Sequence, residues 1–321
     1  MEEKWKKVNP VLPLDYPDPD VIRVDDTYYM VSTTMHFMPG CVILRSYNLA
    51  DWEIYSYVYE TLELTDQECL KNGKNAYGQG MWAATLRYEK GMFYLIFVAN
   101  DTRKTYLFRA PDLKGPWQKN EIEGFYHDCS LLFDEGRAFL AYGNRQIYVM
   151  ELNEEMTAPK EGGLHKLLVE DPDEVYLGYE GAHWYKINGK YYMVYADISR
   201  GRPTCLGYAI SDNPLGPYEK KGIIIDNTGC DPSSWNDHGS IQKIGEDYYV
   251  FYHRSTHNSV YSRRVCAEKI QINEDGTIDE VEMTTQGAES HIPETRVLTA
   301  SAFCKINGKA YLENYTSATE S

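Results

Sequence analysis

The sequence predicts an all-β fold, a single-domain five-bladed β-propeller, and three observations support this prediction. One hairpin pattern occurs five times along the 321 residues. Tyrosine is unusually frequent, with 28 residues and pairs such as Tyr28-Tyr29, and aromatic side chains favour strands. A hydrophobic repeat of 3.6 residues, which would indicate helices, is nearly absent.

Each copy of the repeat is a turn of Gly, Asp, Glu or Asn followed by an aromatic-rich strand, which is a hairpin signal. Further strand-like runs and turns lie between the copies and give roughly four strands per repeat. A propeller closes radially and needs no second domain to cover its edges. A β-sandwich is the alternative, but its strands need not repeat a whole hairpin. The five copies begin at Val24, Tyr88, Phe133, Lys186 and Lys243.

The repeat also sets the expected domain boundary. We assign residues 1–290 to the propeller and residues 291–321 to a C-terminal hairpin or appendage. The C-terminal segment contains one more hairpin-like pattern at 301–312, but it is too short to form a packed accessory domain.

The net charge of −16 at pH 7 favours a neutral binding partner. Nucleic acid and anionic membrane surfaces would be repelled by such a chain. No apolar run approaches the roughly 18 residues of a membrane span, and the N-terminal residues lack the hydrophobic stretch of a signal peptide, so we expect a cytoplasmic protein. The seven cysteines contain no CxxC pair, which favours reduced thiols over disulfides or a zinc site.

The repeat predicts which side chains meet at the centre of the ring. The innermost strand of each blade lines the central channel, so one side chain per blade should face the axis. Carboxylates that converge on one axis repel each other, which costs stability and is tolerated mainly where chemistry needs it. Counting back ten or eleven residues from the first position of each aromatic pair gives Asp18, Trp82 or Ala83, Asp128, Glu180 and His238.

Three carboxyl groups in one pocket suit the hydrolysis of a glycosidic bond. That reaction needs a carboxylic acid to protonate the leaving oxygen and a carboxylate to activate water or attack the sugar. The third carboxylate would disfavour ionisation of the acid and orient it. Taken singly, each residue has an ordinary explanation, because an Asp beside Pro is commonly a turn residue and a His in a strand is commonly a hydrogen-bonded core group.

Motifs around the channel residues lie at 9–20, 32–40, 80–88, 127–134, 179–186 and 238–240. Together they resemble glycoside hydrolase family 43, from residue 9 to about residue 270. The resemblance implies an inverting enzyme in which Asp18 is the general base and Glu180 the general acid. It implies that Asp128 tunes and orients Glu180.

The same resemblance implies a set of substrate-binding residues. His36 and Phe37 match a loop at the pocket mouth, Trp82 matches a wall residue, and Arg264 matches an arginine near the catalytic subsite. Aromatic faces and a fixed guanidinium suit the C–H surfaces and hydroxyls of sugars. The alternatives are that Phe37 and Trp82 are core residues and that Arg263 is the inward arginine.

His238 matches an axial histidine that, in many relatives, contacts a hydrated calcium ion. Calcium prefers oxygen ligands, so an ion supported by His238 would be held largely by water and would have a structural or electrostatic role. Water without an ion is the alternative.

On this resemblance we expect an exo-acting enzyme that releases terminal α-L-arabinofuranosyl residues from arabinoxylan-type oligosaccharides of plant cell walls. A β-xylosidase acting on xylo-oligosaccharides is the alternative, because the two sugars can present similar hydroxyl layouts. An endo-acting hydrolase would need an open groove, which depends on the loops around His36 and residues 60–77. A non-catalytic propeller that binds carbohydrate or protein should lack at least one of the three acids, and none is missing.

Overall fold

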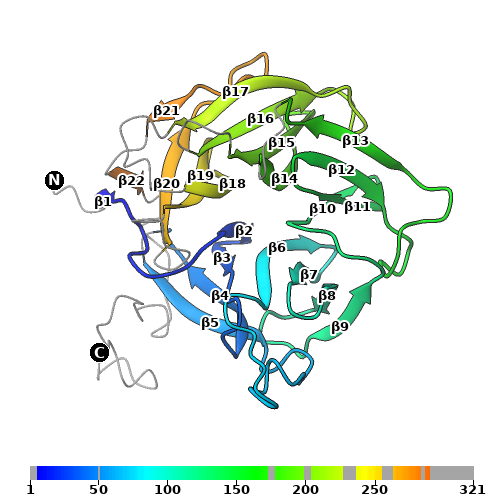
Figure 1. The fold of residues 1–321 in the computed structure, drawn as a ribbon. Helices are drawn as coiled ribbons and strands as arrows, with labels where there is room; N and C mark the ends of the chain where they lie inside the picture. The colour runs from blue at the N-terminus through cyan, green and yellow to red at the C-terminus, as the bar shows by residue number, and fades with distance from the viewer. Residues whose placement is uncertain are drawn as a thin grey trace.

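The computed structural model is a five-bladed β-propeller, with five sheets arranged as a ring around a central axis (Figure 1). It describes residues 6–49, 51–172, 178–198, 204–226, 236–254, 263–282 and 286–289. These residues include no helix, and therefore none that could cross a membrane. The predicted fold class is confirmed, whereas residues 291–321 lie outside the described part and the boundary at 290 stays a prediction.

The first three blades each have four strands, and every neighbouring pair of strands within them is antiparallel. Blade 1 comprises β2 (Asp20–Val24), β3 (Thr27–Ser32), β4 (Gly40–Ser46) and β5 (Trp52–Tyr59). Blade 2 comprises β6 (Met81–Glu89), β7 (Met92–Ala99), β8 (Lys104–Ala110) and β9 (Gln118–Ile122). Blade 3 comprises β10 (Ser130–Asp134), β11 (Arg137–Tyr142), β12 (Gln146–Glu151) and β13 (His165–Glu170).

The last two blades depart from the four-strand pattern at their outer edges. Blade 4 comprises β14 (Tyr179–Ile187), β15 (Lys190–Asp197), β16 (Cys205–Ser211), β17 (Glu219–Asp226) and the short β21 (Val281–Glu282), which runs parallel to β17. The sheet of blade 5 comprises β18 (Asn236–Ile244), β19 (Asp247–Arg254) and β20 (Arg264–Ile270). The first strand of every blade, from β2 to β18, lies nearest the axis (Figure 1).

The five predicted hairpins join the first two strands of the five blades. Their turns contain residues with positive φ, a conformation that Gly, Asn and Asp adopt most easily and that matches the twist of a tight hairpin. This requirement explains the turn composition that repeats along the sequence. The positive-φ residues of these turns are Asp25, Lys90, Gly91, Glu135, Gly136, Asn188, Gly189 and Gly245.

The hydrophobic core is divided among the interfaces between blades. Five clusters of buried side chains each combine residues from two neighbouring blades, including the pair formed by blades 5 and 1. Aromatic residues predicted on the second strands contribute to them, such as Phe139 and Tyr192, both fully buried. Burying one such side chain is worth about 1.5–3 kcal/mol, so each repeat stabilises the ring through its neighbours.

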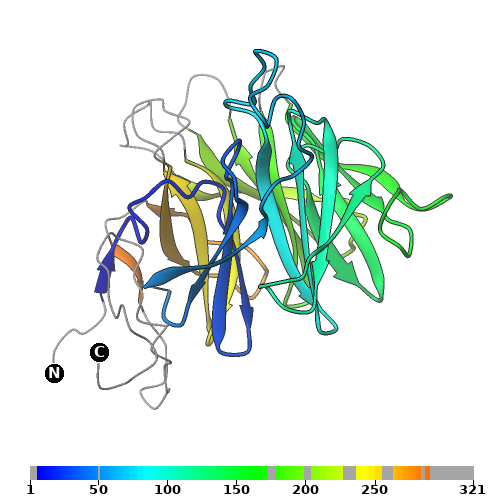
Figure 2. The ribbon, with the colours of Figure 1, turned by 90° about the horizontal axis from the view of Figure 1, so that it is seen from below.

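The N-terminal segment closes the ring against blade 5. Leu12 and Val265 exchange two backbone hydrogen bonds of 3.2 Å, and the Tyr16 N–H donates to the Arg263 carbonyl at 2.9 Å. β1 (Lys6–Val8) pairs antiparallel with β22 (Gln286–Glu289), beside β20 in Figure 1. Asp18, which follows this segment, is therefore held next to blade 5. In the side view of Figure 2, the connection between β5 and β6 projects beyond the strands.

Candidate active site

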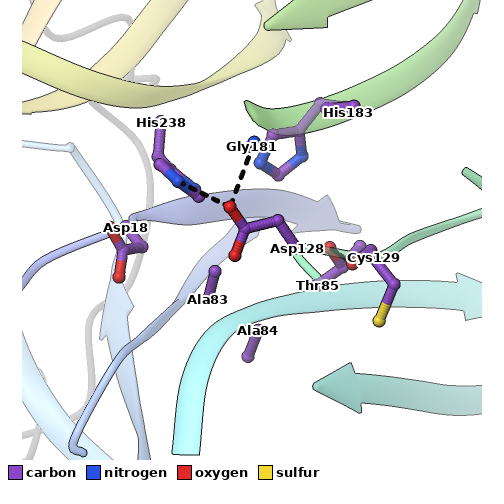
Figure 3. A pocket seen from close by; sticks show the side chains of 10 residues that line it. Asp18, Ala83, Ala84, Thr85, Asp128, Cys129, Gly181, His183 and His238 are labelled. Atoms are coloured by element: carbon purple, nitrogen blue, oxygen red, sulfur yellow. Dashed lines mark hydrogen bonds and ion pairs between the residues drawn. The ribbon is translucent and has the colours of Figure 1, made fainter. Parts of the chain in front are cut away.

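One residue in each blade, two positions before or after the first residue of the inner strand, has a left-handed backbone conformation. Positive φ is uncommon for non-glycine residues, and such strain gathers at functional sites. All five residues line one axial pocket of about 10 Å³, which has room for about one water molecule (Figure 3). They are Asp18 (φ 54°), Ala83 (27°), Asp128 (49°), Gly181 (64°) and His238 (43°).

The fourth of these positions is held by Gly181, whereas counting along the repeat had placed Glu180 there. The strand register shifts between Glu180 and His183, as it does between Trp82 and Thr85 in β6. A β-bulge adds one residue and re-aims the side chains beside it. In blade 4, Gly181 is the equivalent of Asp18, and Glu180 is the residue before it.

Asp18 is a buried carboxylate, 4% exposed, with donors around both oxygens. Arg263 Nη1 lies 3.1 Å from Asp18 Oδ1, and Thr33 Oγ1 donates to Asp18 Oδ2 at 2.5 Å. The Asp18 backbone N–H donates to His253 Nδ1 at 3.1 Å. Burial raises the pKa of Asp18, but Arg263 and His238 outweigh burial and hold that pKa well below its ordinary value. Asp18 is therefore ionised at neutral pH, as a general base must be.

The structure places Arg263, and not the expected Arg264, against Asp18. The Arg263 guanidinium also lies over Trp82, with its carbon 5.5 Å from the ring centroid. Arg264 is the first residue of β20 and pairs with Arg254 on β19. Successive side chains along an extended chain point to opposite sides, so a shift of one residue decides which arginine faces the pocket.

Asp128 is also buried, and one of its oxygens meets three partners. Its Oδ2 lies 3.3 Å from His127 Nε2 and 3.3 Å from His238 Nε2, and it accepts a hydrogen bond from the Gly181 N–H at 3.2 Å (Figure 3). Burial raises the pKa of Asp128, but His127 and His238 together hold it below its ordinary value.

The buried carboxylates keep both histidines protonated. Asp128 is the main cause that raises the pKa of His127 to about 9. Burial lowers the pKa of His238, but Asp128 and Asp18 outweigh it and raise that pKa to about 10. At neutral pH the two buried carboxylates therefore face the cations Arg263, His127 and His238, which offset the cost of burying like charges together.

Glu180 lies beside this ion-pair network and keeps 15% of its side chain exposed. Its Oε2 accepts a hydrogen bond from Asn144 Nδ2 at 2.8 Å and lies 3.8 Å from His127 Nε2. Among the residues that the structure describes, both contacts engage Oε2, which leaves Oε1 to carry and deliver a proton.

The predicted residues His36 and Phe37 contact each other and Tyr77. His36 and Phe37 belong to the connection between β3 and β4, and Tyr77 packs edge-on against His36 with ring centroids 5.3 Å apart. Phe37 is 58% exposed and is therefore not a core residue. A bridge between Met35 and Met81 ties this connection to β6. Among the described contacts, neither His36 nor Phe37 touches the three carboxylates.

Sequence reasoning missed four polar residues that contact the carboxylates: Thr33, His127, Asn144 and His253. His127 directly precedes Asp128 in the motif, so its proximity could have been expected. His253 lies near the end of the aromatic strand of the fifth repeat, level with Asp237 of the inner strand. Asn144 lies in the connection between β11 and β12, where the sequence offers no comparable signal.

The described residues do not fit a calcium ion bound by His238. Its Nε2 faces Asp128, and its raised pKa keeps the imidazole protonated, whereas a metal ligand must be neutral. Calcium takes about six to eight oxygen ligands, more than the small pocket can accommodate. His127, Asp128 and Glu180 offer ligand atoms within 4.8 Å of one another, but these atoms already pair with each other or with Asn144. Calcium binding stays a prediction for chelation to test.

Comparison with known proteins places this geometry in a family. The chain is 28% identical over 233 residues to the Bacteroides ovatus protein named Non-reducing end alpha-L-arabinofuranosidase BoGH43B, covering 69% of this chain and 42% of the relative. It is 24% identical over 279 residues to a protein named Beta-xylosidase from Formosa agariphila, covering 78% of this chain and 46% of the relative.

Among solved structures, the Bacteroides eggerthii protein titled Bifunctional GH43-CE has a TM-score of 0.77 and 32% identity, covering 90% of this chain and 36% of that one. The xylan beta-1,4-xylosidase of Bacillus halodurans has a TM-score of 0.76 and 25% identity, covering 91% of this chain and 60% of that one. The chain spans less than half the length of the two curated relatives. The sequence profile of Glycosyl hydrolases family 43 matches residues 8–278, which is most of the chain. The chain therefore belongs to glycosyl hydrolase family 43.

Proposed function

We propose that the protein is an inverting exo-glycoside hydrolase that releases terminal α-L-arabinofuranosyl residues from arabinoxylan-type oligosaccharides. One observation carries the proposal. A buried carboxylate held ionised, Asp18, and a partly exposed carboxyl, Glu180, both lie close enough to His238 to raise its pKa. Hydrolysis of a glycosidic bond needs this combination of a base and an acid.

The proposed reaction involves two proton transfers, one to Asp18 and one from Glu180. Asp18 takes a proton from a water molecule, and the water oxygen forms a bond to the anomeric carbon. Glu180 gives its proton to the glycosidic oxygen, whose bond to the anomeric carbon breaks, and the leaving sugar departs as an alcohol. Arg263 and Thr33 fix the direction of the Asp18 carboxylate through one contact on each oxygen. Asp128 transfers no proton.

The inverting outcome follows from the family resemblance and requires space for water between the acid and the base. Carboxyl groups about 6.5–9.5 Å apart leave that space, whereas about 5–5.5 Å brings the base into direct attack on the sugar. Proton NMR of the first product distinguishes the two. Early appearance of the retained anomer would contradict the role of Asp18 as a base.

The preference for α-L-arabinofuranosides rests on the overall resemblance. A relative named as an arabinofuranosidase supports it, while another named as a β-xylosidase keeps the second substrate as the alternative. The net charge of −16 is compatible with a neutral oligosaccharide. The deciding measurement compares kcat/KM for 4-nitrophenyl α-L-arabinofuranoside and β-D-xyloside, with Asp18→Ala as the inactive control. A folded protein that hydrolyses neither substrate would refute the proposal.

A further inference from the structure

His127 connects two of the three carboxyl groups of the site. Its Nε2 lies 3.3 Å from Asp128 Oδ2 and 3.8 Å from Glu180 Oε2, and its side chain is 35% exposed. The second partner of Glu180 Oε2 is Asn144, whose Nδ2 donates at 2.8 Å. One imidazole edge and one amide therefore converge on a single oxygen of Glu180.

The backbone holds His127 and Asn144 in this arrangement. The His127 carbonyl accepts a hydrogen bond from the Gly143 N–H at 3.0 Å, and the Arg145 N–H donates to the Tyr179 carbonyl at 2.8 Å. The connection at 143–145 thus joins the residue before Asp128 to the residue before Glu180. Gly143 has φ 132°, and a Cβ there would meet the Gln146 carbonyl oxygen at 2.0 Å, so only glycine fits this connection.

We infer that His127 is a positioning residue for the general acid: with Asn144 it fixes the Glu180 carboxyl through Oε2 and stabilises the carboxylate that remains after proton transfer. This inference rests on the proposed hydrolase function. In the step concerned, the bond between Glu180 Oε1 and its proton breaks and a bond from that proton to the glycosidic oxygen forms. Negative charge then develops on a carboxyl that already has a cation beside it, and such preorganised charge lowers the barrier.

Among the described residues, the titratable groups around Glu180 come from the two blades that flank blade 4. His127 and Asp128 belong to blade 3 and His238 to blade 5. Asp128 and His238 are paired with each other, as the Asp128 Oδ2 contact shows. The protonation of His127, whose pKa is raised to about 9, therefore decides whether the remaining charge beside Glu180 is positive. A cation there favours the ionised form of Glu180, and its removal favours the protonated form.

The first test is the pH profile of His127→Gln, which keeps a hydrogen-bond donor but removes the cation. The alkaline limb of kcat/KM reports the acid of the free enzyme and should move to higher pH by about one unit, because Glu180 keeps its proton longer. His165→Gln is the matched control, because His165 bonds to the Tyr142 hydroxyl and, within the described part of the chain, to no carboxylate. An unmoved alkaline limb in His127→Gln would overturn the inference.

A second readout depends on the leaving group. The dinitrophenolate of a 2,4-dinitrophenyl pentoside departs with little help from an acid. The leaving group of a phenyl pentoside is more basic and requires protonation by the acid. If His127 acts through Glu180, kcat/KM of His127→Gln at pH 7 should fall about tenfold or more for the phenyl substrate and much less for the dinitrophenyl one. Equal losses for both substrates would contradict a role in acid catalysis and would assign His127 to folding or sugar binding.

A third measurement needs no turnover and separates this inference from the proposed function. Interaction between two groups is reciprocal, so Glu180→Gln should lower the NMR titration midpoint of His127 by about one unit. Circular dichroism would verify that the variant is folded. An unchanged His127 midpoint would refute the coupling. A lowered midpoint would support the coupling even if the wild-type protein hydrolyses no pentoside, a result that would refute the proposed function alone.

Discussion

Gly181→Ala is the substitution whose effect the structure defines most sharply. Gly181 has φ 64°, and a Cβ at this position would lie 2.7–2.8 Å from three atoms of the His238 ring. The Gly181 N–H also donates to Asp128 Oδ2, so the substitution strains a backbone that holds a carboxylate. Gly189 provides a matched control in the same blade, because it has φ 82° and a Cβ there would meet no other atom within 4 Å.

The expected losses of stability follow from two separate penalties, the backbone strain of a left-handed alanine and the steric clash with His238. Alanine in the left-handed region costs about 1–2 kcal/mol, of which about 0.4–1 kcal/mol is returned by the less flexible unfolded chain. Gly189→Ala should therefore lose about 1 kcal/mol or less. Gly181→Ala adds the clash with His238, and overpacking of this kind costs about 1–3 kcal/mol, for a total of about 2–4 kcal/mol.

Thermal unfolding and kinetics measure both effects. At about 2–4 °C per kcal/mol, Gly181→Ala should lower Tm by roughly 4–16 °C and Gly189→Ala by less than about 4 °C. Displacement of His238 and Asp128 should also reduce kcat/KM about 10- to 100-fold in Gly181→Ala only. Equal Tm shifts in the two variants, or wild-type activity in Gly181→Ala, would show that His238 does not pack on Gly181 as described.

Four further predictions concern the three carboxyl groups, His238 and the metal. Asp18→Ala and Glu180→Ala should each reduce kcat/KM roughly 10²- to 10⁴-fold without loss of folding, and a variant that keeps more than about a tenth of the activity would lose its assigned role. Asp128→Asn removes a negative charge near Glu180 and should therefore move the alkaline limb of kcat/KM to lower pH. The shift should be less than about one unit, because His127 then loses its main partner and its proton, and the loss of that cation acts in the opposite direction. In the wild type, the protonated His238 contributes stability that is complete below pH 6.5 and is lost as the pH rises towards its folded-state pKa of about 10. The wild-type Tm should therefore fall between these pH values. The fall should be smaller in Asp128→Asn, because Asp128 is the main partner that raises the pKa of His238. EDTA should leave kcat/KM unchanged, and a loss that Ca²⁺ restores would instead support the predicted calcium.

The fold was predictable because one local rule repeats five times. Each turn requires residues that tolerate positive φ, and each following strand supplies aromatic side chains that pack between blades. The outer strands were less predictable. β21 joins blade 4 after the chain has passed through blade 5, and no local pattern marks such a long-range pairing.

The site was predictable to within one residue. Asp18, Asp128 and His238 stand at equivalent positions of their blades, but Glu180 precedes its equivalent because of the bulge in β14. The arginine in the pocket is Arg263, one residue before the predicted Arg264, for a related reason. Side-chain direction alternates along an extended chain, so an error of one residue in the predicted position selects a side chain on the opposite side. Partners such as Asn144 come from connections whose geometry depends on other blades.

The two buried carboxylates explain why every blade has a left-handed residue at this position, including the two blades without a polar side chain there. Ala83 contributes its backbone N–H, which donates to Thr33 Oγ1 at 2.8 Å, and Thr33 in turn donates to Asp18. Gly181 likewise contributes only a backbone N–H, to Asp128.

A left-handed residue turns its N–H out of the strand ladder, which makes the backbone itself available as a donor at the axis. Blades 2 and 4 thus supply neutral donors, one through Thr33 and one directly, while blade 5 supplies the charge of His238. Backbone donors cannot lose a proton in the working pH range, so the orientation of Asp18 and Asp128 depends less on pH than their charge balance does. The pH response of the site is therefore concentrated in the two histidines, His127 and His238, that contact Asp128.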